Sequence, residues 1–261
     1  MQRTSLLLVL ALVAACSTSS GNTEEPPAPS ATPTTAPTAS AVPKDAGAKD
    51  SGPHAASAAL QRCAESKGPV GTIADVVTRL NALTAKGGDT ACFIATLPRP
   101  LAVVATLNTA SAQPAGGRGA PRLLLMLPKI VISAVPEGEG SKAIELGEWM
   151  GTRATIKAEI PMPVTSPIAA DAPFKRILQG SDKTVCATCH GQEERHPSIP
   201  SAFVSNAIKP PAATELTIDE LQELHTLCTT SGLESPRCNV IHALFDFGEV
   251  TQGAFSAVVG G

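Results

Sequence analysis

Two cysteines and a histidine in the last third of the chain restrict its fold and chemistry more than any other feature. They form the run Cys186-Ala187-Thr188-Cys189-His190, which is followed by Gly191. Two thiols three residues apart suit one turn of helix, so both sulfurs can face the same way with the imidazole beside them. The pattern is that of covalent haem attachment, in which each thiol forms a thioether and the histidine ligates the iron.

Other chemistries share this spacing. A thiol–disulfide oxidoreductase uses the first cysteine of such a pair as an activated thiolate, and a short structural disulfide uses only the two sulfurs. A zinc site normally adds a second ligand pair, and the sequence has no second CxxC and no HxxxH. Residues 173–180 indicate a short helix and a glycine turn instead of the βαβ pattern that surrounds a thioredoxin-like motif. Haem attachment is the favoured interpretation, and the other readings stay open.

The segment from Phe174 to Gly191, FKRILQGSDKTVCATCHG, resembles the opening of a single-haem c-type cytochrome domain. The resemblance covers residues 173 to 261. It implies one covalent haem c held by Cys186 and Cys189, with His190 as the proximal iron ligand. It also implies electron transfer or haem-based sensing. A single CxxCH means a single haem, which favours an electron carrier over an enzyme and argues against diheme peroxidase chemistry.

The distal iron ligand departs from the usual cytochrome arrangement, because no methionine follows Met162. Met162 stands between two prolines but precedes the haem motif in the chain. His225 and His242 lie on apolar faces of two expected helices, one over 217–229 and one that begins at Ser235. Met162, His225 and His242 are therefore the candidates for the sixth ligand, beside an open or water-bound position.

The start of the chain is typical of an exported lipoprotein. A short basic segment precedes the ten-residue apolar run 6–15, which is too short for a transmembrane helix but typical of a signal peptide. The small residues directly before Cys16 resemble the lipobox of bacterial lipoproteins. The resemblance implies a signal peptide over 1–15, acylation of Cys16, and a lipid anchor that holds the protein in the cell envelope, at the outer membrane or the periplasmic face.

The seven cysteines divide into three groups. Cys16 is assigned to lipid and the CxxCH pair to haem, which leaves four cysteines. An even remainder in an exported protein suggests two disulfides. Of the three possible pairings, we favour Cys63–Cys92 with Cys228–Cys238, because it closes the shorter loops.

The rest of the pattern predicts an α+β fold with five regions along the chain. A signal peptide over 1–15 and a disordered Pro-, Ala-, Thr- and Ser-rich tether over 16–57 precede a helical segment over 58–96. Residues 97–165 alternate with period two and predict a small antiparallel sheet with one buried and one solvated side. Residues 166–261 are expected to form a cytochrome c-like helical domain.

Local signals place several elements more closely. Thr72 with Asp75 nearly forms a capping box at the start of an amphipathic helix, and Thr217 with Glu220 forms a complete one. On the strand over 152–160, Ile156 and its alternate neighbours face one side, while Thr155, Lys157 and Glu159 face the other. A helix is expected over 201–208, and Trp149 is expected in the core.

Charge and motifs exclude several functions. The net charge is −3 and the pI about 6.0, so no basic surface for nucleic acid is expected. The sequence has no phosphate-binding loop, no GxSxG and no zincin motif. The favoured function is one-electron transfer by a haem protein of the cell envelope, with a redox partner protein that the sequence does not identify. The alternatives are a non-redox, disulfide-stabilised surface lipoprotein and a thiol–disulfide oxidoreductase that uses Cys186 and Cys189.

Overall fold

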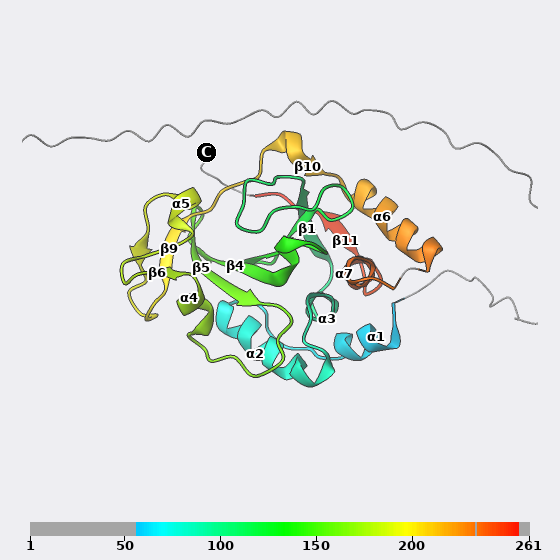
Figure 1. The fold of residues 1–261 in the computed structure, drawn as a ribbon, viewed down its shortest axis with the longest axis horizontal. Helices are drawn as coiled ribbons and strands as arrows, with labels where there is room; N and C mark the ends of the chain where they lie inside the picture. Colours follow the sequence, from blue (N-terminus) through cyan, green and yellow to red (C-terminus); the bar gives the residue numbers. More distant parts are fainter. Residues whose placement is uncertain (1–55, 233, 256–261) are drawn as a thin grey trace, which may run out of the picture. The chain divides into compact units, whose positions relative to one another are not determined.

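A nine-stranded sheet forms the centre of the computed structural model (Figure 1). The structure describes residues 56–232 and 234–255, all within one compact unit, Ala48–Gly261. The predictions for residues 1–15, for Cys16 and for nearly all of the tether lie outside the described residues.

Five consecutive strands form an antiparallel meander at the centre of this sheet. They are β1 (Leu101–Thr106), β2 (Arg122–Met126), β3 (Ile130–Ala134), β4 (Ala143–Met150) and β5 (Ala154–Pro161). Beyond β5 the sheet continues with β9 (Phe203–Asn206) and β8 (Glu194–Arg195). At the other edge, β1 pairs antiparallel with β10 (Glu215–Leu216) and parallel with β11 (Val250–Gln252). A separate two-stranded sheet joins β6 (Leu178–Gln179) to β7 (Lys183–Thr184).

In the part of the chain that the structure describes, six of the seven α-helices contribute to the core on one face of the sheet. These six are α1 (Ala58–Ala64), α2 (Ile73–Leu83), α3 (Thr90–Ala95), α4 (Ala172–Arg176), α6 (Ile218–Ser231) and α7 (Pro236–Phe245). The seventh, α5 (Ala187–His190), carries the CxxCH motif. Figure 1 shows α2, α3 and α4 along one side of strands β4 and β5, with α5 near β9. We call this side of the sheet the helix-covered face.

The helix starts follow the predicted caps. The side chains of Thr72 and Asp75 complete a capping box at α2, and those of Thr217 and Glu220 complete one at α6. Ser235 caps α7 directly before Pro236. These predictions are confirmed because each depends only on residues within one turn of the helix start.

The predicted strands are confirmed over residues 97–165, but the prediction of a small sheet with one solvated side is wrong, because these strands belong to a nine-stranded sheet with residues packed on both faces. The alternation of the strands divides the sheet into two faces. On β5, Ile156, Ala158 and Ile160 belong to the main core under the helices. The opposite face, which we call the cavity face, carries a smaller apolar cluster of Val104, Leu124 and Val131. Both faces of the sheet are therefore covered at least in part by other residues.

The predicted cytochrome c-like helical domain at the C-terminus is wrong. The C-terminal part of the chain supplies β8 and β9 to one edge of the main sheet and β10 and β11 to the other. Its helix α7 packs on α3, an element of the N-terminal helical segment. The helix expected over 201–208 is also wrong, since Phe203–Asn206 is strand β9 paired with β5. Pairing with the preformed β5 edge outweighs the weak local preference of this short segment.

Both predicted disulfides are confirmed. Cys63–Cys92 links α1 to α3, and Cys228–Cys238 links α6 to α7. Two disulfides are typical of a protein in an oxidising, exported environment. Among the helices that the structure describes, none combines the length and the apolar character needed to cross a membrane.

Candidate functional site

The CxxCH motif forms one tight helical turn, as its spacing predicted. The backbone amide of His190 donates to the carbonyl of Cys186 over 2.9 Å, and α5 ends at Gly191. Gly191 has φ 77°, a conformation that glycine adopts readily. Cys186 and Cys189 are both free thiols, so they form no short disulfide in this structure.

A cavity of about 200 Å³ lies between this helical turn and the cavity face of the sheet. Cys186, Cys189 and His190 all line it, so the structure brings together the three residues that the sequence singled out. Its apolar wall comes from the sheet and the C-terminal segment, with Leu124, Val131, Trp149 and Phe255.

Trp149 belongs to this wall and not to the main core as expected. Its ring meets Phe255 edge-on, with centroids 6.4 Å apart. It lies near the end of β4 on the cavity face, where its register partner on β5 is Thr155. A single aromatic side chain in the sequence carries no signal for which face of a strand buries it.

Gly147 leaves room in the floor of the cavity. It sits on β4 between Val131 on β3 and Lys157 on β5, and all three residues line the cavity. A Cβ atom at Gly147 would lie 3.3–3.4 Å from side-chain atoms of Thr155. Because Gly147 has no side chain, this central position of the sheet leaves space in the cavity.

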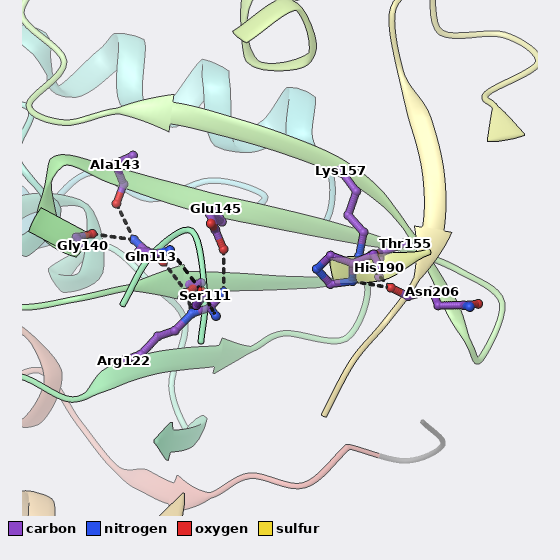
Figure 2. A network of polar contacts seen from close by, with 11 residues as sticks. Ser111, Gln113, Arg122, Gly140, Ala143, Glu145, Thr155, Lys157, His190 and Asn206 are labelled. Atoms are coloured by element: carbon purple, nitrogen blue, oxygen red, sulfur yellow. Dashed lines mark hydrogen bonds and ion pairs between the residues drawn. The ribbon is translucent and has the colours of Figure 1, made fainter. Parts of the chain in front are cut away.

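His190 is held by one backbone carbonyl (Figure 2). Its Nδ1 atom lies 2.7 Å from the carbonyl oxygen of Asn206 on β9. Lys157 Nζ lies 3.1 Å from the same oxygen, 3.2 Å from Nδ1, and 2.7 Å from Thr155 Oγ1, to which it donates. With the ring proton on Nδ1, both side chains donate to Asn206, and Nε2 keeps its lone pair. This is how a metal-ligating histidine is usually oriented, since its other nitrogen donates to a carbonyl or carboxylate.

Burial sets the charge of these two groups. Lys157 is 7% exposed, and burial lowers the pKa of its ammonium to about 8. Burial, helped by the positive charge of Lys157, lowers the pKa of His190 to about 4. At neutral pH the imidazole is therefore neutral, which is the form that binds metals.

The Cys186 thiol lacks the lowered pKa that thiolate chemistry needs. Burial raises the pKa of Cys186 above the ordinary thiol value, although a hydrogen bond with Thr184 acts in the other direction. A catalytic thiolate needs the opposite, a lowered pKa. The thiol–disulfide alternative therefore loses its main physical requirement.

A buried hydrogen-bond chain fixes the start of the motif. Glu193 accepts from the backbone amide of Thr184 over 2.6 Å and from its hydroxyl over 2.7 Å. The same hydroxyl accepts from the amide of Cys186 over 3.1 Å. Thr184 is fully buried, whereas Glu193 and Cys186 are partly buried. Glu193 thereby ties the segment before α5 to the segment after it.

A second polar network forms the far wall of the cavity (Figure 2). Arg122 contacts Glu145 over 2.5 Å and donates to Ser133 over 2.6 Å, and Gln113 donates to the carbonyl of Gly140 over 2.9 Å. Burial raises the pKa of Glu145, and Arg122 partly offsets this effect. This network places paired polar groups along one side of the cavity.

None of the three candidates for the distal ligand lies at the cavity. Met162 is partly buried against the main core, and His225 and His242 meet each other between α6 and α7. A haem attached at Cys186 and Cys189 would therefore need another sixth ligand or keep an open or water-bound position.

Sequence reasoning missed several residues that shape the site, chiefly Lys157, Asn206, Glu193 and Gly147. Lys157 was placed on the solvated side of its strand, where only long-range packing could bury it. No protein-family model matches the chain, and no curated protein or solved structure gives a match. The chemistry of the site therefore has to be argued from its own residues.

Proposed function

We propose that this protein carries one covalently attached haem c and transfers single electrons at the cell envelope. The observation that carries the proposal is the arrangement of Cys186, Cys189 and His190, with two free thiols and a neutral imidazole around one cavity. When bound, the haem supplies an iron that cycles between two oxidation states.

The residues present fit such a group. Both thiols are unpaired and can form thioethers, and His190 Nε2 keeps a lone pair while Nδ1 donates to Asn206. Apolar side chains, among them Leu124 and Trp149, line the opposite wall, which suits the flat apolar body of a porphyrin.

The size of the cavity supports an electron-transfer role over a closed catalytic pocket. Its volume is about 200 Å³, which is smaller than the ~300–1,000 Å³ typical of ligand sites. It therefore covers only part of a haem-sized group. Cys189 is exposed at its rim, so an edge of the bound group would reach the surface, where a redox partner protein can approach.

The proposal includes a location. The lipobox-like residues before Cys16 support an acyl anchor, and the Pro-rich stretch after them supports a tether between the membrane and the haem-binding part. With such an anchor the protein would act in the envelope, at the outer membrane or the periplasmic face. A non-redox, disulfide-stabilised surface lipoprotein remains the alternative, because the two disulfides alone are compatible with it.

A pyridine haemochrome spectrum tests the proposal. The protein is made in a host with c-type haem maturation, beside the variant Cys186→Ala/Cys189→Ala and the control Thr188→Ala. Thr188 is exposed between the two cysteines, and its replacement keeps both thiols. We expect a haem c α band that survives acid–acetone extraction in the wild type and the control, and no such band in the double variant. A wild type without covalent haem contradicts the proposal and leaves the surface-lipoprotein alternative.

A second pair of variants tests the role of the cavity while the CxxCH motif stays unchanged. Gly147→Leu places a branched side chain in the cavity floor and leaves the motif intact, whereas Gly147→Ala adds one methyl group. We expect the leucine variant to lose most of its haem or to show a shifted spectrum, and the alanine variant to resemble the wild type. Equal haem content and unchanged spectra in both variants would show that the haem does not occupy this cavity.

A further inference from the structure

The histidines expected near a haem instead form a cluster of their own on the helix pair α6 and α7. His225 lies one turn before Cys228 on α6, and His242 lies one turn after Cys238 on α7. The disulfide between these two cysteines holds the helices together at that level. Asp246, one turn after His242, is the C-cap residue of α7. Helix spacing and the disulfide thus bring two imidazoles and one carboxylate to a single point.

Short contacts join the three side chains. His225 Nε2 lies 2.6 Å from Asp246 Oδ1, and His242 Nδ1 lies 2.8 Å from Asp246 Oδ2. The two imidazole rings meet edge-on with centroids 5.3 Å apart. One possible ligand atom from each residue lies within 4.8 Å of the others.

We propose that His225, His242 and Asp246 bind one divalent transition-metal cation, with Zn²⁺ as the probe of that class. Two imidazole nitrogens and one carboxylate oxygen form the donor set of zinc sites that keep a fourth position open for water. Imidazole ligands suit Zn²⁺, Cu²⁺, Ni²⁺ and Fe²⁺ and exclude the oxygen-preferring Mg²⁺ and Ca²⁺. This site is separate from the haem cavity, whose lining includes none of the three residues.

Charge favours a cation at this point. The recorded ion-pair partners of Asp246, in the part of the chain that the structure describes, are the two imidazoles, and neither a lysine nor an arginine pairs with it. A divalent cation is attracted by the carboxylate of Asp246. On binding, the protons on His225 Nε2 and His242 Nδ1 move to the other ring nitrogens, and an imidazolium would instead release a proton to solvent.

The site is part preformed and part adaptable. The side chain of His242 is 9% exposed, whereas those of His225 and Asp246 are 26% and 17% exposed. Bond lengths of about 2.0–2.2 Å in a tetrahedral zinc site separate the ligand atoms by roughly 3.3–3.5 Å. The present spread of up to 4.8 Å would therefore close by roughly 1.3–1.5 Å when a cation binds, through rotation of the two more exposed side chains. These side chains also give the cation its path from solvent.

Zinc titration of the whole exported chain tests this proposal. Cys186 and Cys189 can also bind zinc, so the titration uses the Cys186→Ser/Cys189→Ser protein after chelation, and again the haem-loaded wild type. We expect one Zn²⁺ per chain with a Kd in the micromolar range or below. At about 100 times the Kd, Zn²⁺ should raise the Tm by roughly 5–10 °C. Co²⁺ in place of Zn²⁺ should show the intense visible bands of a four-coordinate site in the haem-free protein.

Three variants decide whether these residues are the ligands. His225→Gln and Asp246→Asn should each weaken Zn²⁺ binding at least about tenfold and remove the rise in Tm, whereas the control His196→Gln should bind as the parent does. His225→Gln replaces a partly exposed side chain, so it carries the test if Asp246→Asn does not fold. Absence of saturable binding in the parent, or equal affinity in the parent and His225→Gln, would overturn the proposal and identify the cluster as a hydrogen-bonded helix clasp.

Discussion

The two faces of the sheet bury their residues in different ways. On the helix-covered face, inward residues such as Leu125 and Ile156 meet six helices in one continuous core. On the cavity face, Leu124 and Val131 form a small apolar cluster beside a cavity, and Lys157 is buried under the CxxCH segment. Adjacent residues of one strand therefore belong to the main core on one side and to the cavity wall on the other.

This contrast shows what an alternating sequence pattern cannot predict, namely whether the polar side of a strand is exposed to solvent. On β5, the pattern correctly assigns Ile156 to the core and Lys157 to the opposite side. It then suggests that Lys157 is solvated, yet only 7% of this residue is exposed. Burial on that side comes from His190 of α5 and from the end of β9, both of which are far from Lys157 in the sequence. The residues of the candidate site lie on the face that local sequence assigns to water.

The largest expected effect comes from a pair of neighbours on β2. Leu125 is fully buried under the helices, and Leu124 lines the cavity. Leu125→Ala should lower the free energy of unfolding by about 2–5 kcal/mol, because it leaves a void in a close-packed core. Leu124→Ala should cost only about 1–2 kcal/mol, because its side chain already borders a cavity. Urea denaturation measures both values.

The same pair should differ in the opposite sense in haem binding. Leu124→Ala should change the visible spectrum or haem content of the mature protein, whereas any Leu125→Ala protein that folds should keep the wild-type spectrum. A larger loss of stability for Leu124→Ala than for Leu125→Ala would contradict the prediction that the helix-covered face contributes more to stability than the cavity face.

Lys157 gives the second largest effect and a pH signature. Burial lowers the pKa of Lys157 to about 8 from the ordinary lysine value of 10.5. Between these values the unfolded chain binds more protons than the folded one, so stability should rise with pH across this window and be lowest, for this group, below pH 8. The rise should reach about 3 kcal/mol. Replacing the lysine by methionine, in Lys157→Met, should remove it.

Ionisation of Cys186 changes stability in the direction opposite to that of Lys157. Burial raises the pKa of this thiol, so the thiol ionises at a higher pH in the folded state than in the unfolded state, and stability falls at high pH. The comparison is therefore made in proteins that also carry Cys186→Ser/Cys189→Ser. Denaturation from pH 7 to 11 should show a steeper increase for the parent than for Lys157→Met. Lys175→Met, at a half-exposed lysine, is the control. Parallel curves for the parent and Lys157→Met would show that burial does not lower the pKa of Lys157.

Glu193 tests whether the segment that covers the cavity face, residues 184–190, unfolds independently of the rest of the protein. Its carboxylate accepts two hydrogen bonds from Thr184. Glu193→Gln should cost about 1–2 kcal/mol, because bonds to a charged acceptor are lost or weakened. Amide hydrogen exchange should accelerate at residues 184–190 and stay unchanged in α2. Exposed Glu194 supplies the control Glu194→Gln, and acceleration of exchange throughout the sheet would contradict a separate cover.

The sequence predicted the elements whose signals are local. The capping boxes at Thr72 and Thr217, the alternation on β5 and both disulfide pairings needed only spacing and cysteine counting. It also identified Cys186, Cys189 and His190 as one group, and the structure places all three at one cavity.

The predictions that failed depended on contacts between distant segments. The CxxCH motif indicated a chemistry, but the fold of a c-type cytochrome does not follow from it, and the C-terminal segment completes the main sheet. β8 and β9 have two and four residues, too few for a periodic signature. His225 and His242 were correctly placed on helix faces, but their partner Asp246 could be found only once α6 and α7 were docked.

The smallest expected effect tests the independence of the two faces from the helix side. Thr72 Oγ1 accepts from the amide of Asp75 at the start of α2, over 3.1 Å. Thr72→Ala should cost about 1 kcal/mol through the lost cap, while Thr78→Ala, at an exposed position within the same helix, should stay within about 0.5 kcal/mol of the wild type. Neither variant should alter the haem spectrum or the zinc affinity. A change in either property for Thr72→Ala would show that the helix-covered face controls the sites, and that the two faces are one cooperative structure.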